Sequence, residues 1–389
     1  MYDLVRLREQ FPVLSTCIYL DSASTSQTPS CAVEAMCGYF YEYAANHGRG
    51  AHHLARRTTE EFEKTRGILG EFLGVPEGNL VFTKNTTDSI NMVAHGFCWN
   101  EGDEVITSSL EHHANYLPWL VLGGKGVSMK VLPHENGIIT PDSLQEMISS
   151  RTKMVAVTHM PNVLGTLQPV DELAAIAHDN GAKILIDAAQ SVGHIPFDST
   201  TFDYLAIPGH KGLLGPQGTG ALYAADWETL SIACHGGGIV ENVYRDSFEL
   251  LPPPACFEPG TPNIPGVIGL GRAIRLVEEL GVETIHSHEV ALGTAMQKGL
   301  SAIEGVTVYS PPGTGVISFN IDRIEPGECA RRLDEMKGIC VRSGMHCAQP
   351  LSSSLNPSGT VRASIGCYST MEEVEALLSC VEIISRDHR

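Results

Sequence analysis

Short apolar segments rich in β-branched residues alternate with amphipathic segments between residues 79 and 207. The apolar segments are Asn79–Thr83, Glu104–Thr107, Lys153–Thr158, Lys183–Asp187 and Tyr204–Ile207. This alternation is typical of an α/β fold, in which helices cover a parallel sheet. Such sheets bind their ligands at the carboxyl ends of the strands. We therefore expect functional residues directly after these segments.

The composition changes after Pro252-Pro253-Pro254, where a loop rich in Pro and Gly precedes a helix from about Val267. Three further strands are expected near Gly315–Ile321, Ile339–Arg342 and Val361–Ile365, followed by a helix from Met371. The chain has 389 residues, more than one hydrophobic core usually holds. We predict a large domain over residues 15–255. Residues 1–14 and 256–389 are expected to form a smaller α+β domain.

The charge of the chain excludes several classes of partner. It has 26 Lys and Arg against 45 Asp and Glu, a formal net charge of -19, which repels nucleic acid and anionic membrane surfaces.

Residues 1–12 carry charges instead of the apolar segment of a signal peptide, and no 18 apolar residues run together. The eleven cysteines are scattered and never spaced as C-x-x-C, so we expect reduced thiols. A cytoplasmic protein with small-molecule and protein partners is expected.

Asp187 ends the apolar segment Lys183–Asp187 and is followed by the small residues Ala188 and Ala189 and by Gln190. A buried carboxylate requires a cationic partner. A protonated pyridine nitrogen is one such partner, and an aspartate facing it keeps the ring cationic, so that the ring can act as an electron sink. An ordinary aspartate at a helix N-cap fits this segment equally well.

Lys211 comes 24 residues after Asp187, where the segment Tyr204–Ile207 runs into Pro208-Gly209-His210-Lys211-Gly212. Glycines on both sides of the lysine let the backbone approach a bound group closely. A buried lysine with a lowered pKa forms an imine with a carbonyl cofactor. Because most lysines are solvated surface charges, the interpretation depends on the neighbouring strand that ends at Asp187.

Two other loops follow predicted strands. Asn85-Thr86-Thr87-Asp88 precedes a helical segment, where hydroxyl and N–H groups bind phosphate or form an ordinary N-cap. Glu111-His112-His113-Ala114-Asn115 suggests zinc, but adjacent histidines do not easily face one ion, and no further Cys or His stands at ligand spacing. We expect no metal, and an imidazole stacked on a flat heteroaromatic ring.

The motifs described above, together with several others along the chain, resemble those of the class V aminotransferase-like enzymes of pyridoxal phosphate fold type I. The specific resemblance is to the group II cysteine desulfurases. The resemblance covers nearly the whole chain. Its segments are Leu20-Asp21-Ser22-Ala23, Arg49-Gly50-Ala51-His52, Thr86-Thr87-Asp88-Ser89-Ile90-Asn91, Glu111-His112-His113-Ala114-Asn115, Asn162-Val163-Leu164-Gly165, Asp187-Ala188-Ala189-Gln190, Gly209-His210-Lys211, Glu258-Pro259-Gly260-Thr261-Pro262-Asn263 and Arg342-Ser343-Gly344-Met345-His346-Cys347-Ala348. It implies a large domain with a mostly parallel seven-stranded sheet covered by helices, plus a smaller α+β C-terminal domain.

The resemblance also implies a cofactor, pyridoxal 5'-phosphate, and a role for each residue around it. Lys211 would form the Schiff base, Asp187 would pair with the pyridine nitrogen, Gln190 would face the ring hydroxyl and His112 would stack on the ring. Thr86, Thr87 and His210 would hold the phosphate. Thr261 would reach the phosphate of a neighbouring subunit, which implies a homodimer. Arg362 would bind the substrate carboxylate with the help of Asn162, and Arg342 and Arg49 would also belong to the substrate site.

Cys347 distinguishes a desulfurase from other members of this fold, because the reaction requires a thiol. Cysteine would condense with the cofactor, Lys211 would remove the α-proton, and a Cys347 thiolate would attack the substrate sulfur. The products would be L-alanine and an enzyme persulfide, for transfer to an acceptor protein in iron–sulfur cluster assembly. Arg342 and His346 are expected to favour the thiolate, because positive charge lowers a thiol pKa. The alternative is one more small buried cysteine.

Two residues depart from the family pattern. Pro208 stands where family members usually have Ser, and Met345 where they often have a second His. The substrate could therefore be L-selenocysteine or another β-substituted amino acid, as in a selenocysteine lyase or another C–S lyase. A class V aminotransferase, or a non-catalytic binding protein that kept the fold, are the remaining alternatives.

Overall fold

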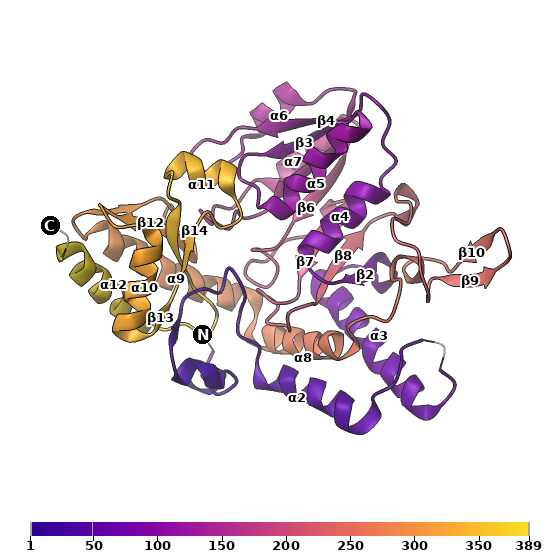
Figure 1. Ribbon diagram of the computed structural model, residues 1–389, viewed down its shortest axis with the longest axis horizontal. Coiled ribbons are helices and arrows are strands. Elements are labelled where there is room, and N and C mark those ends of the chain that lie inside the picture. The colour runs from indigo at the N-terminus through magenta and orange to yellow at the C-terminus, as the bar shows by residue number, and fades with distance from the viewer. Residues whose placement is uncertain (1, 49, 388–389) are drawn as a thin grey trace.

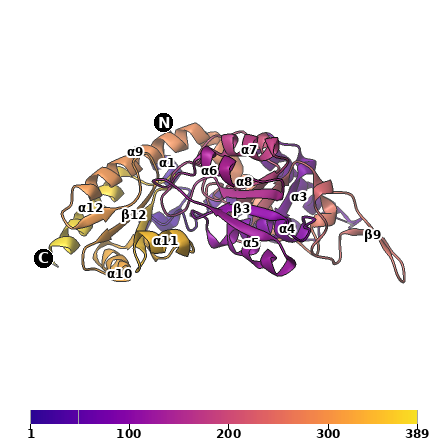
Figure 2. The ribbon, with the colours of Figure 1, turned by 90° about the horizontal axis from the view of Figure 1, so that it is seen from above.

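The computed structural model describes residues 2–48 and 50–387. It consists of a larger and a smaller sheet that lie side by side, each covered by helices (Figures 1 and 2). None of the described helices has the length and hydropathy required to cross a lipid bilayer.

Within the described residues the larger sheet has seven strands, in the order β2-β8-β7-β6-β5-β3-β4. Their bounds are Leu80–Thr83 (β2), Glu104–Ser108 (β3), Ser128–Leu132 (β4), Thr152–Thr158 (β5), Lys183–Asp187 (β6), Tyr204–Pro208 (β7) and Gly220–Ala224 (β8). Strands β7, β6, β5, β3 and β4 pair in parallel, whereas β8 is antiparallel to both β7 and β2. The expected α/β fold with a mostly parallel seven-stranded sheet is confirmed.

Helices cover both faces of this sheet (Figure 2). One face carries α4 (Thr86–Gly96) and α5 (Leu117–Val121), and the other carries α3 (His53–Leu73), α7 (Val170–Asp179) and α8 (Ile264–Leu280). Alternate residues of β5 therefore enter different cores: Val155 and Val157 pack with α7, and Met154 and Ala156 with α4. Because helices bury both faces of these strands, successive residues along each strand are apolar, and the sequence shows continuous apolar segments.

The smaller sheet is antiparallel, in the order β11-β12-β15-β14. Its strands are Val306–Val308 (β11), Val316–Ile321 (β12), Arg342–Gly344 (β14) and Thr360–Ser364 (β15). Helices α9 (Val282–Ser301), α10 (Pro326–Lys337) and α12 (Met371–Arg386) pack against it. Strand β1 (Ile18–Tyr19) pairs in parallel with β13 (Ile339–Cys340), which fastens the N-terminal segment to this part of the molecule.

The remaining elements lie around these two sheets. They are α1 (Leu4–Arg8), α2 (Ser30–Gly38), α6 (Pro141–Met147), α11 (Gln349–Leu355), β9 (Val240–Val243) and β10 (Phe248–Leu250). Strands β9 and β10 form a hairpin that projects from the body of the molecule (Figure 1). Helix α8 packs against α2 and α3 beside the larger sheet. The division of the chain after residue 255 stays a prediction.

Candidate active site

A cavity of about 240 Å³ lies where the carboxyl ends of the larger sheet meet the smaller sheet. The loops after β3, β5, β6 and β7 line it on one side, and β14 and β15 line it on the other. Most of the predicted site residues meet here: Thr86, Thr87, His112, Asn162, Asp187, Gln190, His210, Lys211, Arg342 and Arg362. We call it the Lys211 cavity.

Lys211 and Asp187 provide the charges on one wall of the Lys211 cavity. Burial lowers the pKa of Lys211 to about 8, although Asp187 acts in the opposite direction. Asp187 is 2 % exposed, burial raises its pKa, and its Oδ1 accepts a hydrogen bond from the N–H of Ala189 at 2.9 Å. The residues after Asp187 form turns, so the helix N-cap alternative is wrong. The site therefore pairs an amine that readily loses its proton with a buried carboxylate that requires a cation.

The first turn of α4 offers unused donors to the same cavity. Asn85 caps the helix, with Oδ1 accepting from the N–H of Asp88 at 3.0 Å. Thr86 Oγ1 and His210 Nδ1 are buried and have no hydrogen-bond partner among the described residues. Burial, and then Lys211, lowers the pKa of His210 to about 4, so the ring is neutral and can donate. Buried polar groups are normally satisfied, and a phosphate would satisfy both.

His112 lines the same cavity as the phosphate donors and Lys211. Burial, and then Lys211, lowers its pKa to about 3, and its Nδ1 accepts a hydrogen bond from the N–H of Ala114 at 3.0 Å. Gln190 is 3 % exposed and donates to the carbonyl oxygen of Ala23 at 2.8 Å. A neutral ring, a buried carboxylate, an amine and free phosphate donors form the donor set that suits pyridoxal phosphate. The cavity therefore fits this cofactor.

Arg362 closes the cavity from the smaller sheet. The residue is 1 % exposed, and its Nη2 donates to Asp21 Oδ1 at 3.1 Å and to Ser24 Oγ at 2.7 Å. Its Nε and the Oδ1 atom of Asn162 lack a hydrogen-bond partner within the described part of the chain. The guanidinium thus keeps a free donor for an acidic group. Sequence reasoning gave no role to Asp21 and Ser24, which lie two and five residues after the end of β1.

Cys347 lies beside the cavity, in the loop between β14 and α11, and is half-buried. His346 and Cys347 have φ of 52° and 54°, a left-handed conformation that side chains disfavour and that functional loops often retain. Arg342 Nη2 donates to the Cys347 Sγ at 3.7 Å. Burial, and then Arg362, lowers the pKa of His346 to about 3. The expectation that His346 supplies positive charge is therefore wrong, because its ring is neutral and Arg342 provides the charge.

Among the described residues, Thr261 is not brought to this cavity. Thr261 is exposed and lines a separate cavity of about 600 Å³ together with Lys84, Asp88 and Asn263. Arg49 lies outside the described residues. For the zinc alternative, the rings of His112 and His113 are 6.2 Å apart, and no group of three or more metal-ligating side chains occurs in the described ranges.

Comparisons with known proteins agree with this geometry. The family model described as "Aminotransferase class-V" matches residues 18–377. A probable cysteine desulfurase from Methanothermobacter thermautotrophicus is 43% identical over 97% of each chain, and a cysteine desulfurase from Escherichia coli is 36% identical over 99% of each chain. The apo structure of cysteine desulfurase from Thermococcus onnurineus superposes with a TM-score of 0.96, at 39% identity over 100% of this chain and 99% of that chain.

Proposed function

We propose that this chain, a cysteine desulfurase of the class V aminotransferase family that uses pyridoxal phosphate, converts L-cysteine to L-alanine in the Lys211 cavity. Cys347 receives the sulfur in this proposal. The observation that carries the assignment of the site is the placement of Lys211, Asp187 and Arg362 around one cavity. The sulfur-accepting thiol is assigned to Cys347 because its Sγ accepts a hydrogen bond from Arg342, which lines that cavity.

The family resemblance assigns the residues that would hold the cofactor, and the unpartnered Thr86 Oγ1 and His210 Nδ1 support the phosphate part of that assignment. Thr86, Thr87 and His210 would bind the phosphate, Asp187 the ring nitrogen, Gln190 the ring hydroxyl and His112 the face of the ring. Lys211 would bind the aldehyde carbon. When bound, pyridoxal phosphate withdraws electrons from the substrate Cα and so makes its proton acidic.

The chain's own side chains would perform the remaining steps. Arg362 and Asn162 orient the substrate carboxylate, because a planar guanidinium forms two hydrogen bonds to a carboxylate. The Lys211 amine accepts the proton from Cα, and a pKa of about 8 suits an amine that must both accept and return a proton near neutral pH. A Cys347 thiolate then attacks the substrate sulfur, so that an S–S bond forms and the C–S bond breaks with its electron pair left on the substrate carbon. Alanine leaves after Cα regains the proton held by Lys211 and Cβ takes up the proton that the Cys347 thiol lost. One cysteine and one enzyme thiol give one alanine and one persulfide.

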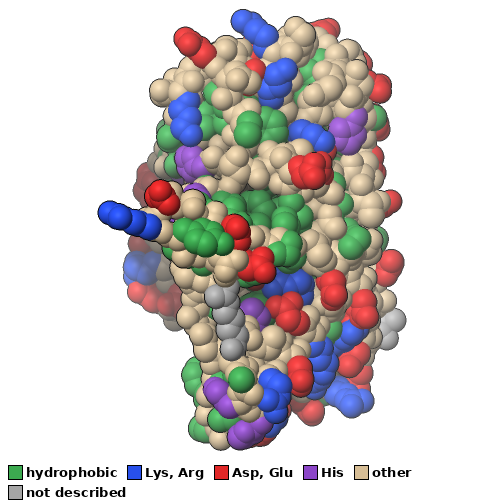
Figure 3. Space-filling view, turned by 90° about the vertical axis from the view of Figure 1, so that its right-hand side faces the viewer, with side chains coloured by type: hydrophobic (Ala, Val, Ile, Leu, Met, Phe, Trp, Pro, Cys, Tyr) green, Lys and Arg blue, Asp and Glu red, His purple; other side chains and the backbone are tan. Residues whose placement is uncertain are grey.

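Two partners complete the proposal. The persulfide requires a thiol-bearing acceptor, which we take to be a protein that delivers sulfur to iron–sulfur cluster assembly in the cytoplasm. A second copy of the chain would form a homodimer, in which Thr261 reaches the phosphate site of the other subunit. The exposed side chains of Val243, Tyr244 and Phe248 on the projecting hairpin support such an association. Figure 3 faces the end of the molecule that carries the hairpin, and hydrophobic side chains gather near its centre.

Product stoichiometry tests the proposed reaction. With L-cysteine, a reducing thiol and no keto acid, the enzyme is expected to form one alanine for each sulfide. An aminotransferase would form no alanine under these conditions. The same assay with L-selenocysteine compares the two substrates, and a purely selenium-specific lyase would leave L-cysteine unchanged.

A further inference from the structure

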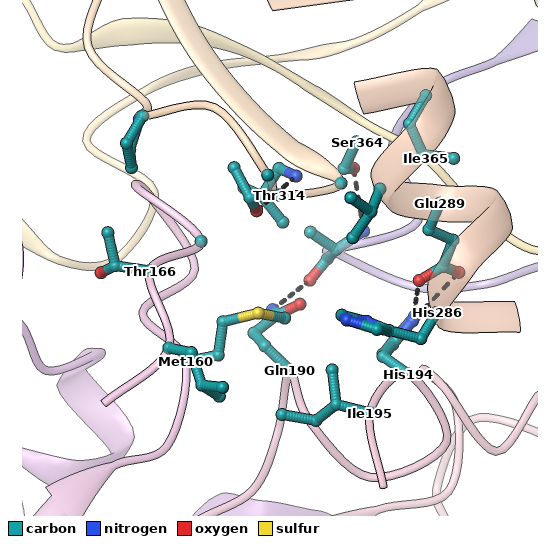
Figure 4. A pocket seen from close by; sticks show the side chains of 18 of the residues that line it. Met160, Thr166, Gln190, His194, Ile195, His286, Glu289, Thr314, Ser364 and Ile365 are labelled. Carbon is teal, nitrogen blue, oxygen red and sulfur yellow. Dashed lines mark hydrogen bonds and ion pairs between the residues drawn. The ribbon is translucent and has the colours of Figure 1, made fainter. Parts of the chain in front are cut away.

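A buried ion pair joins the loop after β6 to helix α9. Nδ1 of His194 lies 2.9 Å and 3.1 Å from the two carboxylate oxygens of Glu289, and the two residues are 9 % and 6 % exposed. Burial opposes the charge on His194, but Glu289 raises the pKa of the imidazole above its ordinary value. The pair is part of the wall of a second cavity, of about 390 Å³, which shares Gln190 with the Lys211 cavity (Figure 4).

The imidazole of His194 packs directly against the backbone beside Lys211. A methyl group added to Gly212 would lie 2.7 Å from Cδ2 of His194 and 2.1 Å from the carbonyl oxygen of Val192. Likewise, a methyl group on Gly193 would lie 2.4 Å from the carbonyl group of Gly212. The glycine after Lys211, expected from the sequence to admit a bound group, thus admits the segment Val192–His194. The position of the Lys211 backbone is therefore coupled to that of His194.

Glu289 packs on the other side against the sheet that carries Arg362. A methyl group on Gly315 would lie 3.5 Å from Cβ of Glu289 and 3.7 Å from Cβ of Ile365. The carbonyl oxygen of Gly315 accepts a hydrogen bond from the N–H of Ile365 at 2.8 Å, three residues after Arg362. The ion pair thus connects the loop after β7, which carries Lys211, with the smaller sheet, in which β15 carries Arg362.

We propose that His194 and Glu289 are positioning residues that hold the amine of Lys211 in a fixed position relative to the guanidinium of Arg362. Neither residue lines the Lys211 cavity. Their function is to keep the proton acceptor at a fixed distance from the group that orients the substrate carboxylate, because a misplacement of about 1 Å can slow a reaction about 100-fold. The role in catalysis rests on the proposed function, whereas the coupling between the pair and Lys211 does not.

Replacing Glu289 by Gln tests the proposal, because it removes the charge and nearly keeps the shape. We expect kcat for alanine formation to fall about tenfold while KM for cysteine changes by less than about threefold, since Arg362 is left intact. Capture of pyridoxal phosphate by the apo protein, followed by the absorbance of the bound cofactor, is expected to slow as well. Glu289→Asp, which keeps the charge, is expected to restore most of both rates.

Arg8→Gln is the matched control. It breaks another ion pair between distant segments, in which Nη2 of Arg8 lies 2.9 Å from Glu373 Oε1, and it is expected to lower the Tm without changing kcat. If Glu289→Gln lowers the Tm but leaves kcat and the capture rate at wild-type values, the pair is only structural and the proposal is overturned. If Glu289→Gln does not fold, His194→Gln is judged by the same criteria. If wild type forms no alanine, the proposed function fails, and the capture rate still decides whether the pair positions Lys211.

Discussion

Arg342 donates a hydrogen bond to the thiol of Cys347, with 3.7 Å between Nη2 and Sγ. Its Nη1 donates to Ser24 Oγ at 2.9 Å, and the same oxygen accepts a hydrogen bond from Arg362 Nη2 at 2.7 Å. Ser24 therefore joins the arginine that contacts the nucleophile to the arginine proposed to bind the substrate carboxylate. A fixed cation beside the sulfur stabilises the thiolate that has to attack the substrate.

Replacing Arg342 by Gln is expected to slow alkylation of Cys347 by iodoacetamide at pH 7 about tenfold, since a hydrogen bond to a charged group contributes about 1.5–3 kcal/mol. Peptide mass spectrometry distinguishes Cys347 from the other ten cysteines. Arg331→Gln, at an exposed site on α10, is the control. An unchanged alkylation rate in Arg342→Gln would show that the guanidinium does not activate the thiol.

Capture of the cofactor by the apo protein is expected to depend on pH through Lys211. The neutral amine is the reactive form, and burial lowers the pKa of Lys211 to about 8. The rate should therefore rise with pH until about 8 and level off above it, whereas a solvated lysine would show a rise that continues beyond pH 10. Asp187 raises the pKa of Lys211, so Asp187→Asn should move the midpoint to lower pH. Stopped-flow absorbance measures both profiles, and a midpoint that moves upward would contradict the assigned charges.

The phosphate site predicts a specific loss of cofactor affinity. Thr86→Val removes a buried hydroxyl that lacks a partner among the described residues, and it keeps the size of the side chain. The Kd for pyridoxal phosphate is expected to rise about tenfold, the effect of losing one hydrogen bond to a charged group, with little change in Tm. Thr284→Val on α9 serves as the control. Equal affinities of wild type and Thr86→Val would place the phosphate elsewhere.

The hairpin of β9 and β10 is expected to hold two subunits together. Tyr244 is 54% and Phe248 51% exposed, and burial of such side chains is favourable by about 1.5–3 kcal/mol each. The double substitution Tyr244→Asp with Phe248→Asp should convert a dimer to monomers in analytical ultracentrifugation. Ile383→Asp, at an exposed position of α12, should remain dimeric. A monomeric wild type would remove the proposed role of Thr261.

The strands that carry the site could be predicted because they are buried on both faces. Segments such as Lys183–Asp187 are continuous apolar runs, and the residues that follow them meet at one edge of the sheet. Strand β4 escaped prediction because it lies at the edge of the sheet and is largely half-buried, so Ser128 and Lys130 interrupt its apolar pattern. Strand β8 directly follows a glycine-rich loop, and its antiparallel direction follows from tertiary pairing alone.

The electrostatic state of the site could not be read from the sequence. Nothing local distinguishes His346, which is buried and neutral, from Arg342, which provides the charge beside Cys347. The pairing of His194 with Glu289 joins residues 95 positions apart and depends on how the two sheets pack. Residue types and their order predicted the chemistry of the site, whereas burial and distance determined which groups are charged.

The most direct test of the account is to locate the sulfur after a single turnover. The enzyme is mixed with L-cysteine without a reducing thiol, alanine is quantified, and peptides are mapped by mass spectrometry. We predict one additional sulfur atom on Cys347 for each alanine, and no alanine beyond background from Cys347→Ala. Alanine formed at the wild-type rate by Cys347→Ala, or an additional sulfur on another cysteine, would contradict the assignment of Cys347 as the sulfur acceptor.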